Sequence, residues 1–259
     1  MPDNPGAFTR KDAWWTMENA IIAGLSKQIV LTRALETSAN NIANQTTAGF
    51  KADHLAFREY IAKLQSAEDT DPLVSLVSDP DTYTDFSAGS LQQTYRDLDF
   101  AIDGDGFFAV ETASGVQYTR DGRFAINNFG ELVTAAGARV LDTGGSPILI
   151  DPEEGPVLLT PEGELQQDQT PIAKLGVYEF TDAAQLRKTG ENMFAAQEQP
   201  MAATFFRARQ GFIENSNVNP VAAMTDMIEI MRSYEQTARM IEISNELARD
   251  AVNRLSQNA

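Results

Sequence analysis

The sequence predicts a discontinuous α+β protein, in which amphipathic helices at the two ends of the chain pack as a coiled-coil-like domain and an all-β domain is inserted between them. Near both ends, apolar residues recur at alternating intervals of three and four, which is the spacing of one helix face. The middle of the chain instead has short runs rich in Val, Ile, Phe, Tyr and Thr, separated by Gly, Asn, Asp and Pro, which is typical of strands and turns.

Composition argues against several functional classes. The 259 residues include 37 acidic and 20 basic side chains, for a formal net charge of −17, so the chain lacks the positive surface that binds nucleic acid or anionic membranes. There is no cysteine, which removes disulfides, thiolate catalysis and Cys-ligated metal. No apolar run reaches the length of about 18 residues that a membrane span needs, so we predict no membrane insertion.

Residues 1–16 are expected to form an unstructured leader, because Pro, Gly and mixed charges occur there without a helical period. They also lack the apolar core of a cleaved secretory signal, and Met17 is an alternative start. The first helix is predicted over Glu18–Asn44, within a helical segment of residues 17–50. Its seam consists of Ile21, Leu25, Leu35, Ala39 and Ile42.

The first helix is expected to end in Asn44–Lys51, where Asn and Thr compete for backbone hydrogen bonds and Gly49 permits a positive φ. Residues 51–90 then form an extended linker. Apolar spacing predicts a short helix over Asp53–Gln65, and the richness of residues 68–85 in Asp, Ser, Thr and Pro predicts a loop.

The inserted β domain is predicted over residues 91–210. Asp121-Gly122, between Val116–Arg120 and Arg123–Asn127, predicts a two-residue hairpin in which Gly supplies a positive φ. The predicted strands are Asp99–Ile102, Phe107–Thr112, Val116–Arg120, Arg123–Asn127, Glu131–Thr134, Arg139–Asp142, Ile148–Ile150, Val157–Thr160 and Ala173–Phe180.

Residues 211–259 contain the last helix, predicted over Val221–Leu255, which would be roughly 50 Å long at ~1.5 Å per residue. Asn245 is the one polar residue of its seam and is of the kind that sets register and partner number. Because two paired helices bury only one side of each, the apolar stripes favour assembly with further subunits. The seam consists of Met224, Met227, Met231, Tyr234, Ala238, Ile241, Asn245, Ala248, Val252 and Leu255.

The chain contains few candidate catalytic or binding motifs. Gly104–Ala109 fits the spacing G-x-G-x-x-A, but the residues that follow predict a strand rather than the helix of a dinucleotide site. Asp103-Gly104-Asp105-Gly106 begins like a calcium loop and then fails at ligating positions. His54 is the only histidine, which excludes a two-His metal site. We therefore predict no catalytic, metal or cofactor-binding residues.

Three stretches resemble one family. The first, with the motif residues Ala39, Asn41, Ile42, Ala43, Asn44, Thr47, Gly49, Phe50 and Lys51, meets the signature A-x-N-[IL]-A-N-x-x-T-x-G-[FY]-K of bacterial flagellar rod and hook proteins. Leu98–Phe108, Tyr118–Gly122 and Leu132–Thr134 are similar to the family's shared β domain, and Gly211–Asn219 is similar to its C-terminal segment. Met17–Ser26 and Asp85–Thr94 look most like proximal-rod members, with distal-rod members as near relatives, although Tyr95-Arg96-Asp97 stands where relatives have a Gly-Asn-like turn.

The resemblance implies a structural subunit of the flagellar rod in the periplasmic basal body, exported by the flagellar type III apparatus without a cleaved signal peptide. It implies self-assembly through the terminal helices, torque transmission from motor to hook, and neighbours of the FlgB, FlgC and FlgG types in a helical tube. It implies no enzyme activity and no cofactor. The interface residues expected on the helices are Ile21, Leu25, Leu35, Ile42, Met224, Met227, Met231, Tyr234, Ile241, Val252 and Leu255.

Three alternatives remain open at this point. The chain can be a distal-rod subunit rather than a proximal one. It can be a hydrolase that uses two carboxylates on the β domain, since 37 acidic residues leave many possible pairs. It can also be a coiled-coil homo-oligomer with no flagellar role.

Overall fold

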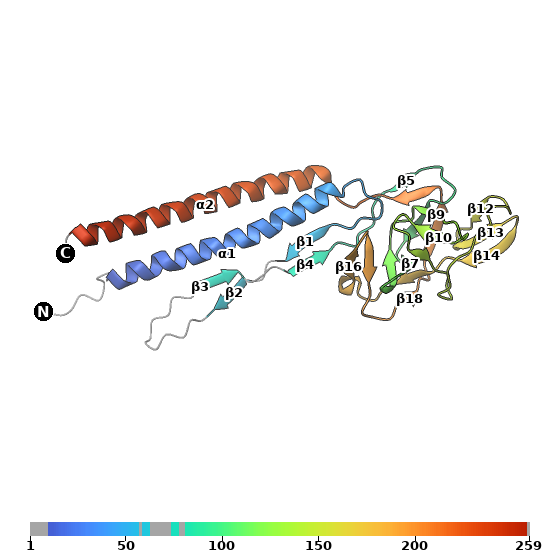
Figure 1. Ribbon diagram of the computed structural model, residues 1–259, viewed down its shortest axis with the longest axis horizontal. Coiled ribbons are helices and arrows are strands. Elements are labelled where there is room, and N and C mark those ends of the chain that lie inside the picture. Colours follow the sequence, from blue (N-terminus) through green and yellow to red (C-terminus); the bar gives the residue numbers. More distant parts are fainter. Residues whose placement is uncertain (1–9, 57–58, 63–73, 78–80, 258–259) are drawn as a thin grey trace. The chain divides into compact units, whose positions relative to one another are not determined.

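The structure is a computed structural model of the chain that describes residues 10–56, 59–62, 74–77 and 81–257 (Figure 1). It is α+β, with a helix near each end and a mostly β middle. The chain forms two compact units. The first comprises Met1–Asn40, Asp53–Tyr83 and Val221–Ala259, and the second comprises Asn41–Ala52 and Thr84–Pro220.

The first unit is built on two long helices that lie side by side, α1 (Arg10–Ala43) and α2 (Pro220–Gln257) (Figure 1). They run antiparallel, because a Cβ on Gly24 would lie 2.8 Å from Ile241 Cγ1 while the Ser38 hydroxyl donates to the Ala223 carbonyl at 3.2 Å. The predicted pairing of the terminal helices is therefore present as a direct contact. In the described part of the chain, neither helix has an apolar stretch that could cross a membrane.

Helix α1 begins at Arg10, before the predicted start at Glu18. Residues 10–17 contain neither Pro nor Gly, so nothing in that stretch stops a helix from extending toward the N-terminus. The first nine residues of the predicted leader lie outside the described residues.

Short strands replace the short helix predicted over Asp53–Gln65. The strand β1 (Asp53–Ala56) pairs with β4 (Asp81–Thr84), and β2 (Glu59–Ala62) pairs with β3 (Val74–Val77), in the register Tyr60 with Leu76. Residues 57–58 and 63–65 of the predicted helix lie outside the described residues. The partners that make these runs strands come later in the chain, and local spacing does not reveal them.

The second unit is a β domain whose largest described sheet has nine strands. A three-stranded sheet and two strand pairs complete it, and β19 and β20 bring the chain back beside its entry strands β6 and β5. The nine strands are β7 (Phe107–Thr112), β8 (Gly115–Thr119), β9 (Phe124–Ile126), β10 (Leu132–Thr134), β11 (Arg139–Val140), β15 (Val177–Glu179), β16 (Arg187–Gly190), β17 (Met193–Ala195) and β18 (Met201–Ala202). The others are β12 (Val157–Leu159), β13 (Glu164–Gln167), β14 (Thr170–Lys174), β5 (Leu91–Gln93), β6 (Phe100–Gly104), β19 (Phe206–Gln210) and β20 (Phe212–Glu214), with a 3-10 turn at Ala183–Gln185.

Two apolar clusters form the core of this domain. The larger centres on Phe100, Phe108 and Phe124, whose rings contact one another edge-on or tilted. The smaller centres on Phe107 and Phe194, which pack together at 5.8 Å between ring centroids. Phe107 and Phe108 are neighbours on β7 and point to opposite faces of the strand, so the two faces of β7 belong to two different clusters.

The predicted Asp121-Gly122 hairpin is wrong. Strand β8 pairs with β7 and β17, whereas β9 pairs with β10, so the segments on either side of Asp121-Gly122 do not pair. Gly122 serves close packing instead, since a Cβ there would lie 1.6 Å from the Phe100 carbonyl oxygen. The expected strand Ala173–Phe180 is broken at Leu175-Gly176, and the polar strand β13 was not predicted.

Candidate functional site

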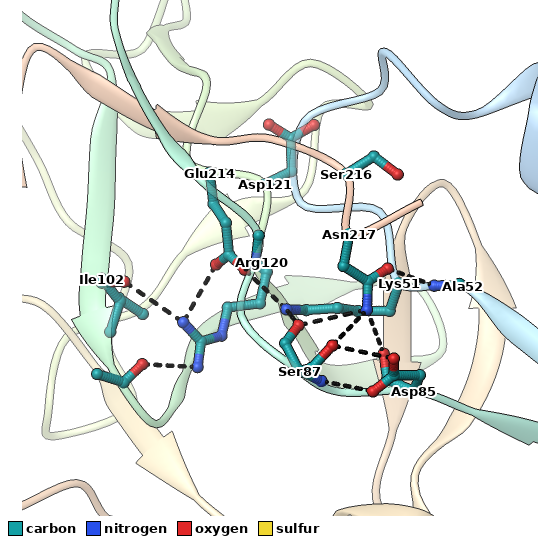
Figure 2. Close-up of polar contacts among 12 residues, drawn as sticks. Lys51, Ala52, Asp85, Ser87, Ile102, Arg120, Asp121, Glu214, Ser216 and Asn217 are labelled. Atoms are coloured by element: carbon teal, nitrogen blue, oxygen red, sulfur yellow. Dashed lines mark hydrogen bonds and ion pairs between the residues drawn. The ribbon is translucent and has the colours of Figure 1, made fainter. Parts of the chain in front are cut away.

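A buried ion cluster, formed by Lys51, Arg120 and Glu214, joins three distant segments of the second unit (Figure 2). Lys51 Nζ lies 2.7 Å from Glu214 Oε1, and Arg120 Nη1 lies 3.2 Å from Glu214 Oε2. The side chains are 1%, 5% and 2% exposed respectively. We call these three residues the Glu214 cluster.

Backbone groups satisfy most of the remaining polar atoms of the Glu214 cluster. Glu214 Oε1 also accepts a hydrogen bond from the Gly89 amide at 2.8 Å. Lys51 Nζ donates to the Ser87 carbonyl at 2.7 Å. Arg120 donates to the carbonyls of Ile102 and Gly104, at 3.4 Å and 2.9 Å, while its Nε is buried without a hydrogen-bond partner among the described residues.

Two cations share one carboxylate in this cluster, so its electrostatics depend on Glu214. Burial lowers the pKa of Lys51 below its ordinary value, and the charge and hydrogen bond of Glu214 act in the opposite direction. Burial likewise lowers the pKa of Arg120, against the attraction of Glu214. Arg120 also lies over the Phe107 ring, at 5.2 Å from the centroid. Without Glu214, two buried positive charges would lack their only ion-pair partner in the cluster.

The loop that carries Lys51 approaches the β domain so closely that only glycine fits at position 49. Gly49 has a φ of +67°, and a Cβ there would lie 2.4 Å from the Arg120 carbonyl carbon. Its amide donates to the Glu214 carbonyl at 2.7 Å. Lys188 Nζ donates to the Lys51 carbonyl at 2.6 Å and lies over the Phe50 ring at 4.4 Å.

Asn217 completes the connection between the entering and leaving segments (Figure 2). Its Oδ1 accepts from the Ala52 amide at 2.8 Å, and its Nδ2 donates to the Asp85 carbonyl at 2.8 Å. The backbone also approaches closely at Gly89, because a Cβ on this residue would lie 1.9 Å from the Asn215 carbonyl oxygen. The residues 49–52, 85–89 and 214–217 are therefore held together by a dense set of short polar contacts.

The motif residues differ in how far they are buried. Asn41, Gly49, Phe50 and Lys51 are buried, and Thr47 Oγ1 donates to Asn44 Oδ1 at 3.2 Å. Ile42 is half-buried, and Ala39 and Ala43 are exposed. Sequence reasoning included Arg120 and Glu214 in family-like stretches but assigned them no role, because nothing in the local sequence marks a charged residue as buried.

The predicted interface residues divide between partly covered and exposed positions of the helix pair. Ile21, Leu35, Ile42, Met227 and Ile241 are half-buried. Leu25, Met224, Met231 and Tyr234 are 48%, 48%, 46% and 36% exposed. The side chains of Val252 and Leu255 lie outside the described residues.

The face of α1 that α2 covers differs from the predicted seam. It includes the small residues Gly24 and Ser38, which contact Ile241 and Ala223 of α2 and are both buried. On α2, Thr237 is buried and Ile241 packs over Gly24. Small side chains let two helices approach closely. Several of the larger apolar residues of the predicted seam lie outside this contact and stay on the surface.

The candidate chemical motifs have structural explanations. Gly104 ends β6 and Asp105-Gly106 leads into β7 at Phe107, so the glycines are followed by a strand and not by a helix, as predicted. A groove of about 410 Å³ is lined by Glu111 and Glu131, but Arg139 pairs with both, at 2.8 Å and 3.6 Å. A guanidinium between the carboxylates leaves no free acid pair in this groove for a hydrolase. His54 packs against Tyr83, at 5.5 Å between ring centroids.

Comparison with known proteins gives one consistent result. The family model "Flagellar basal body rod FlgEFG protein C-terminal" matches residues 209–255, and "Flagellar hook protein FlgE/F/G D1 domain" matches residues 101–168. The flagellar basal-body rod protein FlgF of Caulobacter vibrioides is 42% identical over 93% of this chain and 99% of its own length. FlgF of Mesorhizobium japonicum is 35% identical over 94% and 100%, and FlgG of Bacillus subtilis is 29% identical over 92% and 99%.

The Glu214 cluster draws one residue from each of the three family-like stretches of this sequence. Lys51 ends the first, Arg120 lies in the second, and Glu214 lies in the third, which falls within the matched residues 209–255. The near full-length relatives and the two matching family models show the family of the protein. The chain belongs to the flagellar basal-body rod protein family, is most similar there to FlgF with FlgG as the next relative, and is a structural, non-enzymatic subunit of the flagellar basal body.

Proposed function

We propose that this subunit builds the rod by packing its terminal helices against those of neighbouring rod subunits, and that it passes torque from motor to hook through these contacts. The observation that carries the proposal is the amount of large apolar surface left on α1 and α2. Ile29, Ile228, Ile243 and Leu247 are 61%, 51%, 57% and 58% exposed. Large exposed apolar surface of this kind marks an interaction site.

The neighbours we propose are rod proteins of the FlgB and FlgC types on the proximal side and of the FlgG type on the distal side. The greater similarity to FlgF than to FlgG supports a proximal-rod position, in the periplasmic part of the basal body. The flagellar export apparatus would deliver the chain to this position. The alternative is a distal, FlgG-type subunit, for which the identity of 29% is the support.

The mechanism we propose couples folding of the helices to assembly. The second unit has its own apolar clusters and the Glu214 cluster, and so carries its own stabilising contacts. The helix pair has a narrow contact face of small residues, and neighbouring subunits would stabilise it by covering its exposed apolar side chains. Torque would then pass between subunits through the ordered helices.

Met231 offers a direct test, because it is exposed in the isolated subunit and belongs to the predicted interface. A strain without the wild-type gene is complemented with Met231→Asp, and purified basal bodies are probed for the subunit. We expect the variant to be absent from basal bodies and motility to be lost, since a buried unpaired carboxylate destabilises an apolar interface. Thr225→Asp places the same charge on the exposed polar side of α2 and should support motility.

Full motility with Met231→Asp would contradict the proposed interface. The position in the rod is tested separately with the deletion strain. If the subunit is proximal, rods of that strain should stop before any FlgG-type protein is added. Basal bodies that retain FlgG would favour the distal alternative.

A further inference from the structure

Three of the places where the chain passes between the two units lie near the Glu214 cluster in the sequence. The unit boundaries fall between residues 40 and 41, 52 and 53, 83 and 84, and 220 and 221. The residues 49–52, 85–89 and 214–217 lie next to the last three of these boundaries, and we call them the latch segments. If the contacts among the latch segments open, three connections of the second unit are released together.

The latch segments bind one another through backbone groups as well as charges (Figure 2). Four of their amides donate to another latch segment at 2.7–2.8 Å. The donors are the amides of Gly49, Ala52, Asp85 and Gly89, and the acceptors are, in the same order, the Glu214 carbonyl, Asn217 Oδ1, the Ala52 carbonyl and Glu214 Oε1. Three of these acceptors belong to segment 214–217, so the other two segments cannot complete their contacts without it.

Glu214 decides whether the buried charges of the cluster attract or repel one another. Lys51 and Arg120 precede it in the sequence by 163 and 94 positions. Burial lowers the pKa of Lys51 and Glu214 opposes this effect, whereas repulsion by Arg120 lowers the pKa further and does so more strongly than Asp85 raises it. Without the Glu214 carboxylate, docking of residues 49–52 would therefore bring two mutually repelling cations into a buried site, which costs free energy.

We propose that the Glu214 cluster is a charge-gated latch: the segment that enters the second unit docks only once Glu214 is in place, and this docking is the last step in the folding of that unit. The apolar core can form first, because the buried members of both apolar clusters lie between Phe100 and Phe194, outside the latch segments. A chain made from its N-terminus supplies Lys51 and Arg120 before Glu214, so the entering segment stays undocked until the leaving segment arrives. This inference concerns the second unit alone and does not depend on the proposed assembly.

Hydrogen exchange on the wild-type full chain tests whether closure of the latch is a separate step. The latch is followed at the amides of Gly49, Ala52, Asp85 and Gly89, and the core is followed at the amides of Phe100 and Leu132, which donate within the β domain. We expect the four latch amides to share one opening constant, roughly 10-fold or more larger than that of the core amides, because a local opening exposes them without unfolding the core. During refolding, pulse labelling should show the core amides protected before the latch amides.

Two substitutions in the cluster test whether charge controls the latch. In Glu214→Gln, the latch amides should exchange roughly 100-fold faster than in the wild type, since a buried pair broken from one side is strongly destabilising, while the core amides stay slower than the latch amides. Lys51→Met removes one of the two cations, so it should slow exchange of the latch amides by more in the Glu214→Gln background than in the wild type. Glu111→Gln, which removes a surface ion pair with Arg139, is the matched control and should leave the latch amides unchanged.

Three results would overturn the latch. One is that the latch and core amides of the wild type share a single opening constant, or that the latch amides are protected first during refolding. Another is that Lys51→Met has the same effect on exchange in both backgrounds, which would show that charge does not control docking. The third is that neither Glu214→Gln nor the double variant folds, because the core would then depend on the latch. If only the double variant folds, removal of the second cation has rescued the chain, which supports charge gating.

Discussion

Lys51 and Glu214 lie 163 positions apart in the sequence, yet Lys51 Nζ is 2.7 Å from Glu214 Oε1. The first residue belongs to the segment that enters the second unit, and the second belongs to the strand that leaves it. Because both side chains are buried, this pair fixes the entry and exit of the chain in one place. Arg120, which directly follows β8, pairs with the other oxygen of the same carboxylate.

Glu214→Gln should destabilise the protein by about 3–5 kcal/mol, the usual cost of breaking a buried pair from one side. The amide keeps the shape of the side chain but removes the carboxylate that forms an ion pair with both Lys51 and Arg120. Urea unfolding of the full chain measures the change. Glu111→Gln, which removes an exposed ion pair with Arg139, should cost at most about 1 kcal/mol. Equal losses in the two variants would contradict the importance assigned to the cluster.

The Lys51→Met variant should differ from the wild type in a pH-dependent manner. Burial lowers the pKa of Lys51 in the folded state, so the unfolded chain binds more protons at this group as the pH approaches 10.5. The wild type should therefore gain stability relative to Lys51→Met as the pH rises from neutral toward 10.5. Paired urea titrations at several pH values give this difference. A difference that stays constant or moves the other way would show that the pKa of Lys51 is not lowered by folding.

Gly49→Ala should lower the stability of the second unit by more than the strain that a non-glycine residue has at a positive φ. A Cβ at this site would lie 2.4 Å from the Arg120 carbonyl carbon, so backbone has to move. Gly137→Ala is the matched control, since Gly137 has a φ of +85° and open space around its Cβ position. We expect about 1 kcal/mol at Gly137 and clearly more at Gly49, measured by thermal and urea unfolding. Similar losses would mean that the close approach can relax.

Ile241→Asp and Met231→Asp should act at different stages. Ile241 packs over Gly24 within the chain, so its replacement should lower the helicity or thermal stability of the isolated subunit. Met231 is exposed in the subunit, so Met231→Asp should leave both unchanged and block only assembly. Circular dichroism of the purified chains distinguishes them. Loss of helicity in Met231→Asp alone would place that residue inside the subunit rather than between subunits.

Tyr95→Asn should stabilise the protein by up to about 1 kcal/mol, because Asn tolerates the left-handed conformation better than a bulky residue does. Tyr95 has a φ of 61° and is 79% exposed, so little packing is lost. Tyr95→Ala removes the same ring without that conformational benefit and should give no gain. A gain in both variants would point to the ring, and no gain in either would show that the backbone at this turn relaxes at little cost.

Sequence reasoning predicted the α+β organisation and many of the strands of the β domain, because helix and strand periods are local properties. It failed where pairing decided the outcome. The Asp-Gly dipeptide at 121–122 has the chemistry of a tight hairpin, but Gly122 packs against the Phe100 carbonyl and the flanking strands pair elsewhere. The segments Asp53–Ala56 and Glu59–Ala62 have partners in later strands, β4 and β3, and therefore form strands rather than a helix.

By itself, the sequence determined that this protein has an amphipathic helix near each end and carries the rod-family motifs, because side-chain spacing and motif residues are written along the chain. Only the tertiary structure decided which helix face is covered inside the subunit and which apolar residues stay exposed. It also decided that Lys51, Arg120 and Glu214 meet in a buried cluster. Burial and charge pairing depend on contacts between residues far apart in the sequence, and these exist only once the chain has folded.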